Sequence, residues 1–475
     1  MRSSYQREFN FTKYLESVVE AETIKYTGRV IAVRGLQIES NGPRSVIGEM
    51  CSIVLRDGTS LLAEVVGLED NKVHLTAFGE TKGIEVGNEV IASGSVLQVP
   101  VGMNLLGRTL DATGRPCDNL GELVPETYYP AINTAPDPLT KLPVNKRLTT
   151  GVRAIDSLLT VGKGQRIGIF AGSGVGKSTL LSMIARNTDA DINVIGLIGE
   201  RGREVLDFIN RDLGKEGLKR SVIVVATGDQ PAICRLRAAY VCTAIAEYFR
   251  DKGKDVMLMM DSVTRFAQAQ REIGLSNGEP PAQSGYPPSV FDLIPKLLER
   301  GGTNDKGSIT AFYTVLVDAD DFNEPITDKV RGTLDGHIVL NRQLAQAYHY
   351  PAIDVLASIS RLSKRVSGRV TQKAVGKIRS WMATYQENET MITAGIYENG
   401  KSPVIDEAIQ KHEEIEAFLK QEEYEPSSME ETLKKLAEIA QIEIPEEEFC
   451  EQPALNNPST AEIVDQAKLS QEENS

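Results

Sequence analysis

The sequence predicts a multidomain fold of three parts: an N-terminal β-barrel, a central α/β domain with a mostly parallel sheet, and a C-terminal α-helical domain. Short β-branched runs separated by turn residues fill the stretch from Thr27 to Val99, as in a small closed barrel. Buried-type strands then alternate with helical stretches from residue 151 to about 360, and helical periodicity without convincing strands follows from Val366 to about Ala440. The 475 residues exceed what one hydrophobic core usually covers, so several domains are expected.

The composition is that of an ordinary globular protein, with 41% hydrophobic and 25% charged residues. No stretch approaches the roughly 20 uninterrupted apolar residues that cross a bilayer. The N-terminus mixes charged and aromatic residues, unlike a secretory signal or a transit peptide, so we expect a soluble, cytoplasmic protein. Five cysteines without CxxC spacing and only four histidines support neither a disulfide framework nor a zinc site.

The net charge of −14 is concentrated at the C-terminus. Residues 411–440 contribute −5 and residues 441–475 contribute −8, so the preceding 410 residues are nearly neutral. The acidic balance therefore describes the end of the chain and argues only weakly against nucleic-acid binding by the rest.

The barrel is assigned to residues 25–99. Its predicted strands are Gly28–Val33, Cys51–Leu55, Leu61–Val66, Lys72–Leu75 and Glu89–Ala92. The dipeptides Asn41-Gly42 and Asp57-Gly58 are typical of hairpin turns.

Residues 1–24 precede the barrel as an amphipathic segment. Apolar residues recur there at helical spacing, at Phe11, Tyr14, Leu15, Val18 and Val19. A helix this short is marginal alone, so it either folds back on its own domain or docks a partner, and the residues leave both open.

The remaining boundaries follow from composition. Residues 100–365 comprise a Gly/Pro-rich linker, to residue 150, and the α/β domain, whose predicted strands are Arg166–Phe170, Val194–Ile198, Val222–Ala226, Val256–Met260 and Ile309–Leu316. Residues 366–440 form the helical domain. Residues 441–475 are acidic and poor in aromatic residues, so we expect a disordered tail.

A glycine-rich loop, Ala171-Gly-Ser-Gly-Val-Gly-Lys-Ser178, joins the predicted strand Arg166–Phe170 to the helical run Thr179–Ile184. This strand–loop–helix context is what a phosphate-binding P-loop requires. The residues expected to bind ATP are Gly172, Ser173, Gly174, Val175, Gly176, Lys177, Ser178 and Thr179. Lys177 would reach the β- and γ-phosphates and the Ser178 hydroxyl would hold Mg²⁺. The strict motif begins with glycine, so Ala171 is a departure, which costs little unless that position needs a positive φ.

Two acidic residues follow other core strands. Asp261 ends the buried run Val256-Met-Leu-Met-Met, where a Walker B aspartate holds the metal. Glu200 follows the strand Val194–Ile198, so it opens at the same sheet edge and could orient the water that attacks a γ-phosphate. A loop glutamate is more often solvated than catalytic, so the residues alone leave its role open.

Five motifs in order resemble the type III protein-export ATPases, within the superfamily of rotary ATP synthase catalytic subunits. They are Ala171–Ser178, Gly199–Glu204, Asp261-Ser-Val-Thr-Arg-Phe266, Pro281-Ala-Gln-Ser-Gly-Tyr-Pro-Pro288 and Ser358-Ile-Ser-Arg361. Residues Gly395–Ile409 look like the flagellar branch. The resemblance spans roughly residues 25–440 and implies a RecA-like P-loop core.

The resemblance implies roles for further residues. Glu200 matches the catalytic glutamate that polarises water, and Arg201 matches a neighbouring site arginine. Arg265 matches an arginine that borders the phosphates. Arg361 matches an arginine finger offered to the γ-phosphate of an adjacent subunit, although by itself it would be read as a helix-end salt bridge. Tyr350 matches an aromatic that stacks on adenine.

The same resemblance implies partners and a location. It implies a homohexamer with sites at its interfaces, a central stalk protein, export chaperone–substrate complexes and a membrane export gate, with the protein cytoplasmic and peripherally bound at that gate. A stator-like negative regulator would meet residues 1–24. The loop Gly274–Pro288 resembles the one facing the ring channel, where Gln283 and Tyr286 would touch a shaft or exported substrate; without the resemblance it is a stiff surface loop.

The function implied is ATP hydrolysis that energises export of flagellar proteins, with unfolding of substrates or their release from chaperones. An injectisome secretion ATPase or a rotary synthase catalytic subunit shares nearly every motif and remains an alternative. A ring-shaped RNA helicase ranks low, because residues 27–99 hold one aromatic, Phe78, and no basic cluster, so no nucleic-acid partner is expected. A nucleotide-binding subunit without turnover is disfavoured by the presence of Lys177, Glu200, Asp261 and Arg361 together.

Overall fold

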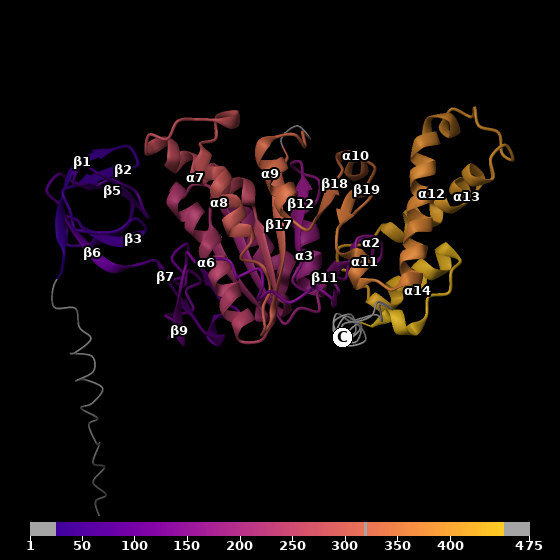
Figure 1. The fold of residues 1–475 in the computed structure, drawn as a ribbon, viewed down its shortest axis with the longest axis horizontal. Coiled ribbons are helices and arrows are strands. Elements are labelled where there is room, and N and C mark those ends of the chain that lie inside the picture. The colour runs from indigo at the N-terminus through magenta and orange to yellow at the C-terminus, as the bar shows by residue number, and fades with distance from the viewer. Residues whose placement is uncertain (1–24, 318–320, 451–475) are drawn as a thin grey trace, which may run out of the picture. The chain divides into compact units, whose positions relative to one another are not determined.

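The computed structural model describes residues 25–317 and 321–450, so the predicted segment 1–24 and residues 451–475 of the predicted tail 441–475 lie outside the described residues. The chain divides into two compact units, Met1–Leu97 and Gln98–Ser475. The first unit holds the barrel, and the second holds both the α/β sheet and the C-terminal helices (Figure 1). The three predicted parts of the fold are therefore confirmed.

Six antiparallel strands close the barrel in the order β1-β2-β5-β4-β3-β6. They are β1 (Thr27–Arg34), β2 (Gln37–Ser40), β3 (Glu49–Val54), β4 (Ser60–Glu69), β5 (Lys72–Ala77) and β6 (Glu89–Val96). Alternate side chains point inward, so residues such as Val30, Ile53 and Leu75 build one apolar core. All five predicted barrel strands are confirmed, and β2 is added to them.

One of the two predicted hairpin turns is wrong. Asp57-Gly58 does join β3 to β4, and the Asp57 carboxylate accepts a hydrogen bond from the Thr59 N–H at 2.9 Å. Asn41-Gly42 does not join paired strands, because β2 pairs with β5 rather than β3. Its function is local instead: the Asn41 side chain accepts from the Arg29 N–H at 2.7 Å.

The second unit is built on a nine-stranded sheet with the order β19-β18-β12-β17-β15-β13-β14-β8, with β16 paired to β17. The strands are β8 (Thr109–Leu110), β12 (Arg166–Ala171), β13 (Ile192–Ile198), β14 (Ser221–Ala226), β15 (Asp255–Asp261), β16 (Gly302–Thr303), β17 (Ser308–Leu316), β18 (Gly336–Leu340) and β19 (Ile353–Ser360). Pairing is parallel from β18 to β8, whereas β19 and β16 run antiparallel to their neighbours. The five predicted strands are confirmed as β12, β13, β14, β15 and β17, and the other four strands of the sheet, β8, β16, β18 and β19, were not predicted.

Helices connect and cover these strands. They are α2 (Arg153–Leu158), α3 (Lys177–Asn187), α4 (Gly202–Asp207), the π-helix η2 (Phe208–Leu213), α5 (Gly214–Lys219), α6 (Ala232–Asp251), α7 (Val263–Ser276), α8 (Pro288–Leu298), α9 (Pro325–Thr333) and α10 (Arg342–Gln346), with short 3₁₀ turns η1 (Met103–Leu105) and η3 (Gln283–Gly285). α6 packs on β13, β14 and β15, and is buried along nearly its whole length. Because parallel strands share one direction, the loops after β12, β13 and β15 meet at a single sheet edge.

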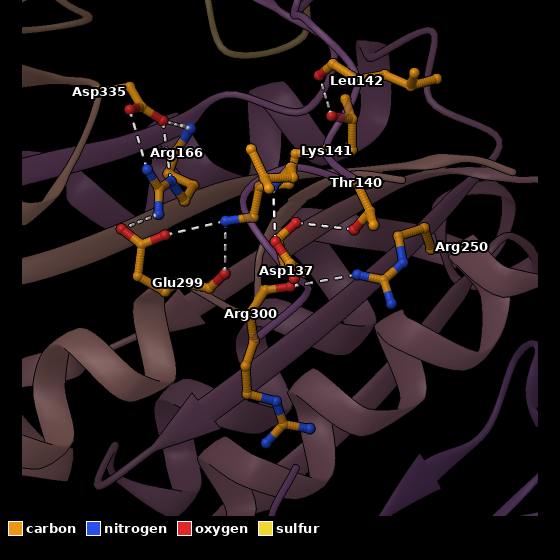
Figure 2. Close-up of polar contacts among 11 residues, drawn as sticks. Asp137, Thr140, Lys141, Leu142, Arg166, Arg250, Glu299, Arg300 and Asp335 are labelled. Carbon is orange, nitrogen blue, oxygen red and sulfur yellow. Dashed lines mark hydrogen bonds and ion pairs between the residues drawn. The ribbon is translucent and has the colours of Figure 1, made fainter. Parts of the chain in front are cut away.

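The predicted linker 100–150 is part of the second unit. It is held at the amino ends of the parallel strands, opposite the loops that follow β12, β13 and β15. It supplies the pair β7 (Gln98–Val101) and β9 (Thr127–Pro130), the strand β8, and β10 (Arg147–Leu148), which pairs with β11 (Val161–Gly162). Lys141 donates to Glu299 at 3.1 Å, and Glu299 also contacts Arg166, which pairs in turn with Asp335 (Figure 2). These contacts fix the linker to the amino ends of the strands.

A fully buried ion pair strengthens this edge. The Arg300 side chain is 0% exposed and meets both carboxylate oxygens of Glu247, at 2.8 and 2.7 Å. Its remaining nitrogen donates to the Ala131 carbonyl in the linker at 2.7 Å, and its own carbonyl accepts from Arg250 (Figure 2). A buried ion pair in which every guanidinium nitrogen is hydrogen-bonded is costly to break from one side only.

The C-terminal helices are α11 (Ser363–Val366), α12 (Arg369–Thr393), α13 (Pro403–Leu419) and α14 (Met429–Ala440), and Figure 1 shows the last three grouped beyond β19. Ser428 and Glu431 form a capping box that starts α14. Leu433, Leu436 and Ile439 on α14 are buried in the same core as the sheet. None of the described helices is both long and apolar enough to span a membrane.

The prediction that disorder begins at residue 441 is wrong for its first ten residues. Ile444 is buried, and a 3₁₀ turn, η5 (Glu446–Phe449), follows it. The Glu448 carboxylate accepts from the Val370 and Thr371 N–H groups at 3.0 and 2.8 Å, so it caps the N-terminus of α12. The acidic composition hid this contact, because the capped helix begins nearly eighty residues earlier in the chain.

Candidate active site

The glycine-rich loop lies between β12, which ends at Ala171, and α3, which begins at Lys177. Gly174 and Gly176 adopt φ values of 77° and 92°, a left-handed conformation that favours glycine. Gly176 precedes α3 without a capping side chain among the described residues, so the first N–H groups of that helix stay available to an anion. Ala171 is the last strand residue, paired with Leu316 and Leu340, and its extended backbone accepts alanine without strain.

Three charged side chains from separate loops meet beside this loop. The Lys177 ammonium lies 2.5 Å from the Asp261 carboxylate and 3.7 Å from that of Glu200, and its side chain is only 11% exposed. Asp261 ends β15, directly beside β13, so the two carboxylates follow neighbouring strands. The predicted convergence of Lys177, Glu200 and Asp261 at one sheet edge is thus what the structure contains.

Hydrogen bonds hold the two acidic residues, through the backbone at Glu200 and through the side chain at Asp261. The Gly199 N–H donates to Ala226 at 2.6 Å and the Glu200 carbonyl accepts from the Gly228 N–H at 3.1 Å, which ties the end of β13 to the end of β14. The Asp261 carboxylate accepts from the Thr314 hydroxyl at 2.8 Å. Thr314 lies on β17, far from the motifs in sequence, and the sequence analysis missed it.

The electrostatics of the cluster are unbalanced, because two carboxylates share one ammonium. Burial, together with the charge of Asp261, raises the pKa of Glu200 to about 7. Burial alone would lower the pKa of Lys177, but the charges of Asp261 and Glu200 outweigh it and raise the pKa. A proton-accepting carboxylate with a pKa near neutrality is suited to taking up the proton of an attacking water.

Two cavities flank the cluster. One, of about 220 Å³, is lined by Ser178, Glu200 and Asp261 together with acidic residues of α4 and η2. The other, of about 780 Å³, is lined by Gly174, Gly176 and Tyr350 and by residues of the C-terminal domain between Ala417 and Glu425. Thr179 and Glu423 border both. The P-loop thus lies between a small acidic pocket and a pocket large enough for a nucleoside.

Tyr350 lies against the P-loop, as predicted for an aromatic that stacks on a base. Its ring carbons come within 3.4 Å of the point where a Cβ on Gly176 would stand. The side chain remains 40% exposed toward the larger cavity. It therefore presents an aromatic surface beside the phosphate-binding loop.

The three predicted arginines are placed differently from one another. Arg265, on α7, packs against Gly199, and its Nε is buried without a hydrogen-bond partner among the described residues. Arg201 is 83% exposed and pairs with Glu204 at 3.5 Å, so the structure does not bring it to Lys177. Arg361, directly after β19, is exposed. Within residues 25–317 and 321–450 its guanidinium forms no hydrogen bond or ion pair, unlike a helix-end salt bridge.

The predicted channel loop is only partly accessible. Gln283, on the 3₁₀ turn η3, is exposed, but Tyr286 is buried and packs against Phe291 and Arg271. The Tyr286 ring therefore packs inside the domain instead of being presented to a shaft or substrate.

The donor set suits Mg²⁺. The Ser178 hydroxyl and the Asp261 carboxylate line one cavity, and oxygen ligands of this kind are what Mg²⁺ prefers. The excess negative charge around Lys177 would be relieved by a divalent cation.

Comparisons with known proteins place these observations in a family. Residues 151–360 match the nucleotide-binding domain of the ATP synthase alpha/beta family, residues 30–94 match its beta-barrel domain, and residues 368–438 match the T3SS EscN ATPase C-terminal domain. The chain is 55% identical to the flagellum-specific ATP synthase of Treponema pallidum, over 91% of this chain and 97% of the relative. This chain belongs to the flagellar and type III secretion ATPases. It is accordingly an ATP-hydrolysing enzyme.

Other members of this ATPase family are nearly as similar. The type 3 secretion system ATPase of Xanthomonas euvesicatoria is 49% identical over 90% of this chain and 98% of the relative. The assembled ATPase EscN of enteropathogenic E. coli, solved in complex with its central stalk EscO, has a TM-score of 0.82 and 44% identity, and covers 87% of this chain and 100% of that one. The family resemblance read from the sequence is confirmed.

Proposed function

We propose that this ATPase hydrolyses MgATP to energise the export of flagellar proteins through a type III secretion apparatus, with unfolding of substrates or their release from chaperones. The observation that carries the proposal is the convergence of Lys177, Glu200 and Asp261 beside a P-loop. Two flagellar relatives, at 55% and 54% identity, exceed the secretion ATPase at 49%, which favours flagellar export over an injectisome role, whereas two other flagellar relatives stand lower, at 47% and 46%.

Each residue of the site has a separate role in the proposed hydrolysis of MgATP. Lys177 and the N–H groups of the loop hold the β- and γ-phosphates, and Ser178 and Asp261 hold Mg²⁺, which neutralises phosphate charge when bound. Glu200 orients the attacking water and accepts its proton. Arg265 borders the phosphates from α7, and Arg201 is a surface arginine that would approach a site only on assembly.

Arg361 completes the site of an adjacent subunit. Its guanidinium is exposed after the last strand of the sheet, so it can reach another molecule, and a fixed guanidinium offsets the charge that develops on the γ-phosphate. A site that needs a residue from its neighbour makes assembly part of catalysis. The proposed active form is a homohexamer with six interfacial sites.

The proposed partners follow from the family. The complex of EscN with EscO supports a central stalk protein as a partner of this chain. Export chaperone–substrate complexes, a membrane export gate and a stator-like negative regulator at residues 1–24 complete the proposal. The enzyme would then work in the cytoplasm, peripherally bound at the export gate.

Trans-complementation tests the shared site directly. Arg361→Ala and Glu200→Gln should each abolish most turnover, while Arg365→Ala, a nearby exposed control on α11, should not. Mixing the two inactive variants should restore activity, because some interfaces then combine an intact Glu200 with an intact Arg361. Full activity of wild type as a demonstrated monomer, or no recovery on mixing, would refute the interfacial site.

The export role is tested separately. Deletion of the gene should stop the appearance of flagellar proteins outside the cell, and wild-type protein but not Glu200→Gln should restore it. Normal flagellar export in the deletion strain, together with a loss of injectisome secretion, would assign the ATPase to the other branch.

A further inference from the structure

The residue before Tyr350 is anchored to the C-terminal domain. The Nδ1 atom of His349 lies 2.9 Å from a carboxylate oxygen of Glu416 on α13, and the imidazole is 4% exposed while the carboxylate is 30% exposed. An ionised carboxylate only accepts hydrogen bonds, so the imidazole is the donor. The hydrogen bond from His349 holds the pKa of Glu416 below its usual range, so the carboxylate is ionised at neutral pH.

The backbone of Tyr350 has a second hydrogen bond to the C-terminal domain. The Tyr350 carbonyl accepts from the Gln421 N–H at 2.9 Å. The Gln421 side chain in turn accepts from the Arg153 N–H and donates to the Gly151 carbonyl, each at 2.8 Å. The chain after α13 is thus fixed to the start of α2, and it backs the Tyr350 loop from the C-terminal domain.

Within the part of the chain that the structure describes, the Tyr350 side chain itself forms no hydrogen bond comparable to these anchors. It is the side chain that is 40% exposed to the larger cavity, with the P-loop on one side. Its orientation depends on where the backbone of residues 349 and 350 is held. A shift of about 1 Å in such a positioning element is enough to weaken binding strongly.

We propose that Glu416 is a positioning residue that acts through His349 to set Tyr350 against the adenine ring, so that adenine binding depends on the placement of α13. This inference rests on the proposed stacking role of Tyr350. It makes the C-terminal helical domain part of nucleotide recognition: a partner that displaced α13 would loosen the base without touching the phosphates.

The test compares two ligands that differ in the base. ADP and inorganic tripolyphosphate are titrated into the full chain by calorimetry. Loss of one base–aromatic stack is expected to weaken binding by roughly five- to 150-fold, so Glu416→Ala should weaken ADP binding by about fivefold or more within that range and leave tripolyphosphate binding unchanged. The KM for ATP should rise by a similar factor while kcat at saturating ATP changes less than twofold. Glu414→Ala is the matched control, because Glu414 lies on the same helix, its side chain is 47% exposed, and among the described residues it pairs only with Lys411.

A double-mutant cycle separates positioning from general damage. In a Tyr350→Ala background, Glu416→Ala should add nothing further to the loss of ADP affinity. His349→Asn, which retains a donor near the Nδ1 position, should keep most of the affinity that His349→Ala loses. Equal weakening of both ligands, or an undiminished effect of Glu416→Ala without Tyr350, would overturn the inference.

The double-mutant cycle also distinguishes the positioning role of Glu416 from the stacking role of Tyr350 on which it rests. If Tyr350→Ala binds ADP as tightly as wild type, the stacking role fails and the positioning role fails with it. If Tyr350→Ala weakens ADP binding but Glu416→Ala does not, only the positioning role is refuted.

Discussion

The pKa of Glu200 makes the pH dependence of ATP hydrolysis a direct test of its role. Burial and the charge of Asp261 raise this pKa from 4.5 to about 7, and a general base works only when ionised. kcat/KM reports the free enzyme, so it should rise with pH through this value. About one-tenth of the carboxyl groups are ionised at pH 6 and about nine-tenths at pH 8, so kcat/KM should increase about tenfold across that interval.

The profile of kcat should differ, because it reports the nucleotide complex. A divalent cation held by Asp261 offsets the negative charge that raises the pKa of Glu200, so the midpoint of kcat should fall below that of kcat/KM. The assay is steady-state ATP hydrolysis with excess Mg²⁺, at a protein concentration where specific activity no longer depends on concentration. Glu200→Gln, which cannot titrate at this position, supplies the background slope from substrate and assembly.

Stability supplies a readout independent of turnover. The pKa of Glu200 is higher in the folded than in the unfolded chain, so its contribution to stability is complete below about pH 4.5 and is lost as the pH rises through about 7. Glu200→Gln should therefore stabilise the nucleotide-free protein at pH 8 by about 1–2 kcal/mol after solvent screening, seen as a higher melting temperature, and should stabilise it much less at pH 5. The role of Glu200 would be refuted if kcat/KM did not change between pH 6 and 8 and if wild type and Glu200→Gln had equal melting temperatures at both pH 5 and pH 8.

Three further predictions concern individual contacts. Arg300→Met leaves the buried Glu247 carboxylate without the Arg300 charge, with the Asn133 amide still donating to it at 3.4 Å, and should cost about 3–5 kcal/mol in urea unfolding. The double variant Arg300→Met/Glu247→Leu should recover much of that loss, and an equal loss in both variants would contradict the buried-charge explanation. Glu448→Ala removes the cap of α12 and should lower stability by about 1–2 kcal/mol, measured against the exposed control Glu447→Ala. Thr314→Val removes the hydroxyl that holds Asp261 and should raise the Mg²⁺ concentration for half-maximal activity by about tenfold, and an unchanged Mg²⁺ titration would show that Lys177 alone orients the carboxylate.

Local patterns in the sequence were sufficient for the P-loop and for Asp261. The loop glycines are required by backbone conformation and the aspartate ends a run of buried strand residues, so both signals lie within about ten neighbouring residues. Parallel strands then place Glu200 at the same edge, which is why its position could be predicted from strand order alone.

Contacts between distant segments could not be predicted in this way. Thr314 is one of several hydroxyls on a buried strand, and nothing in its neighbourhood indicates that it faces Asp261. Glu448 lies in an acidic stretch whose composition is typical of disorder, yet its carboxylate caps a helix. Residues 417–425 carry no nucleotide-binding motif, but they close one side of the larger cavity. In each case the partner is chosen by tertiary packing, which leaves no periodic trace in sequence.

The two edges of the central sheet differ in a way that suits a machine driven by nucleotide. At the amino edge, Arg166 and Arg300 are each held by carboxylates and tie the linker to the strands. At the carboxyl edge, two acids compete for Lys177, and the Nε of Arg265 is buried without a hydrogen-bond partner among the described residues. In the proposed function, phosphate and metal would supply the partners that these groups lack, so nucleotide binding would stabilise this edge selectively. Nucleotide binding would therefore act on the edge where the C-terminal domain contacts Tyr350 through Gln421, whereas the ion pairs of Arg166 and Arg300 at the opposite edge are complete without a ligand.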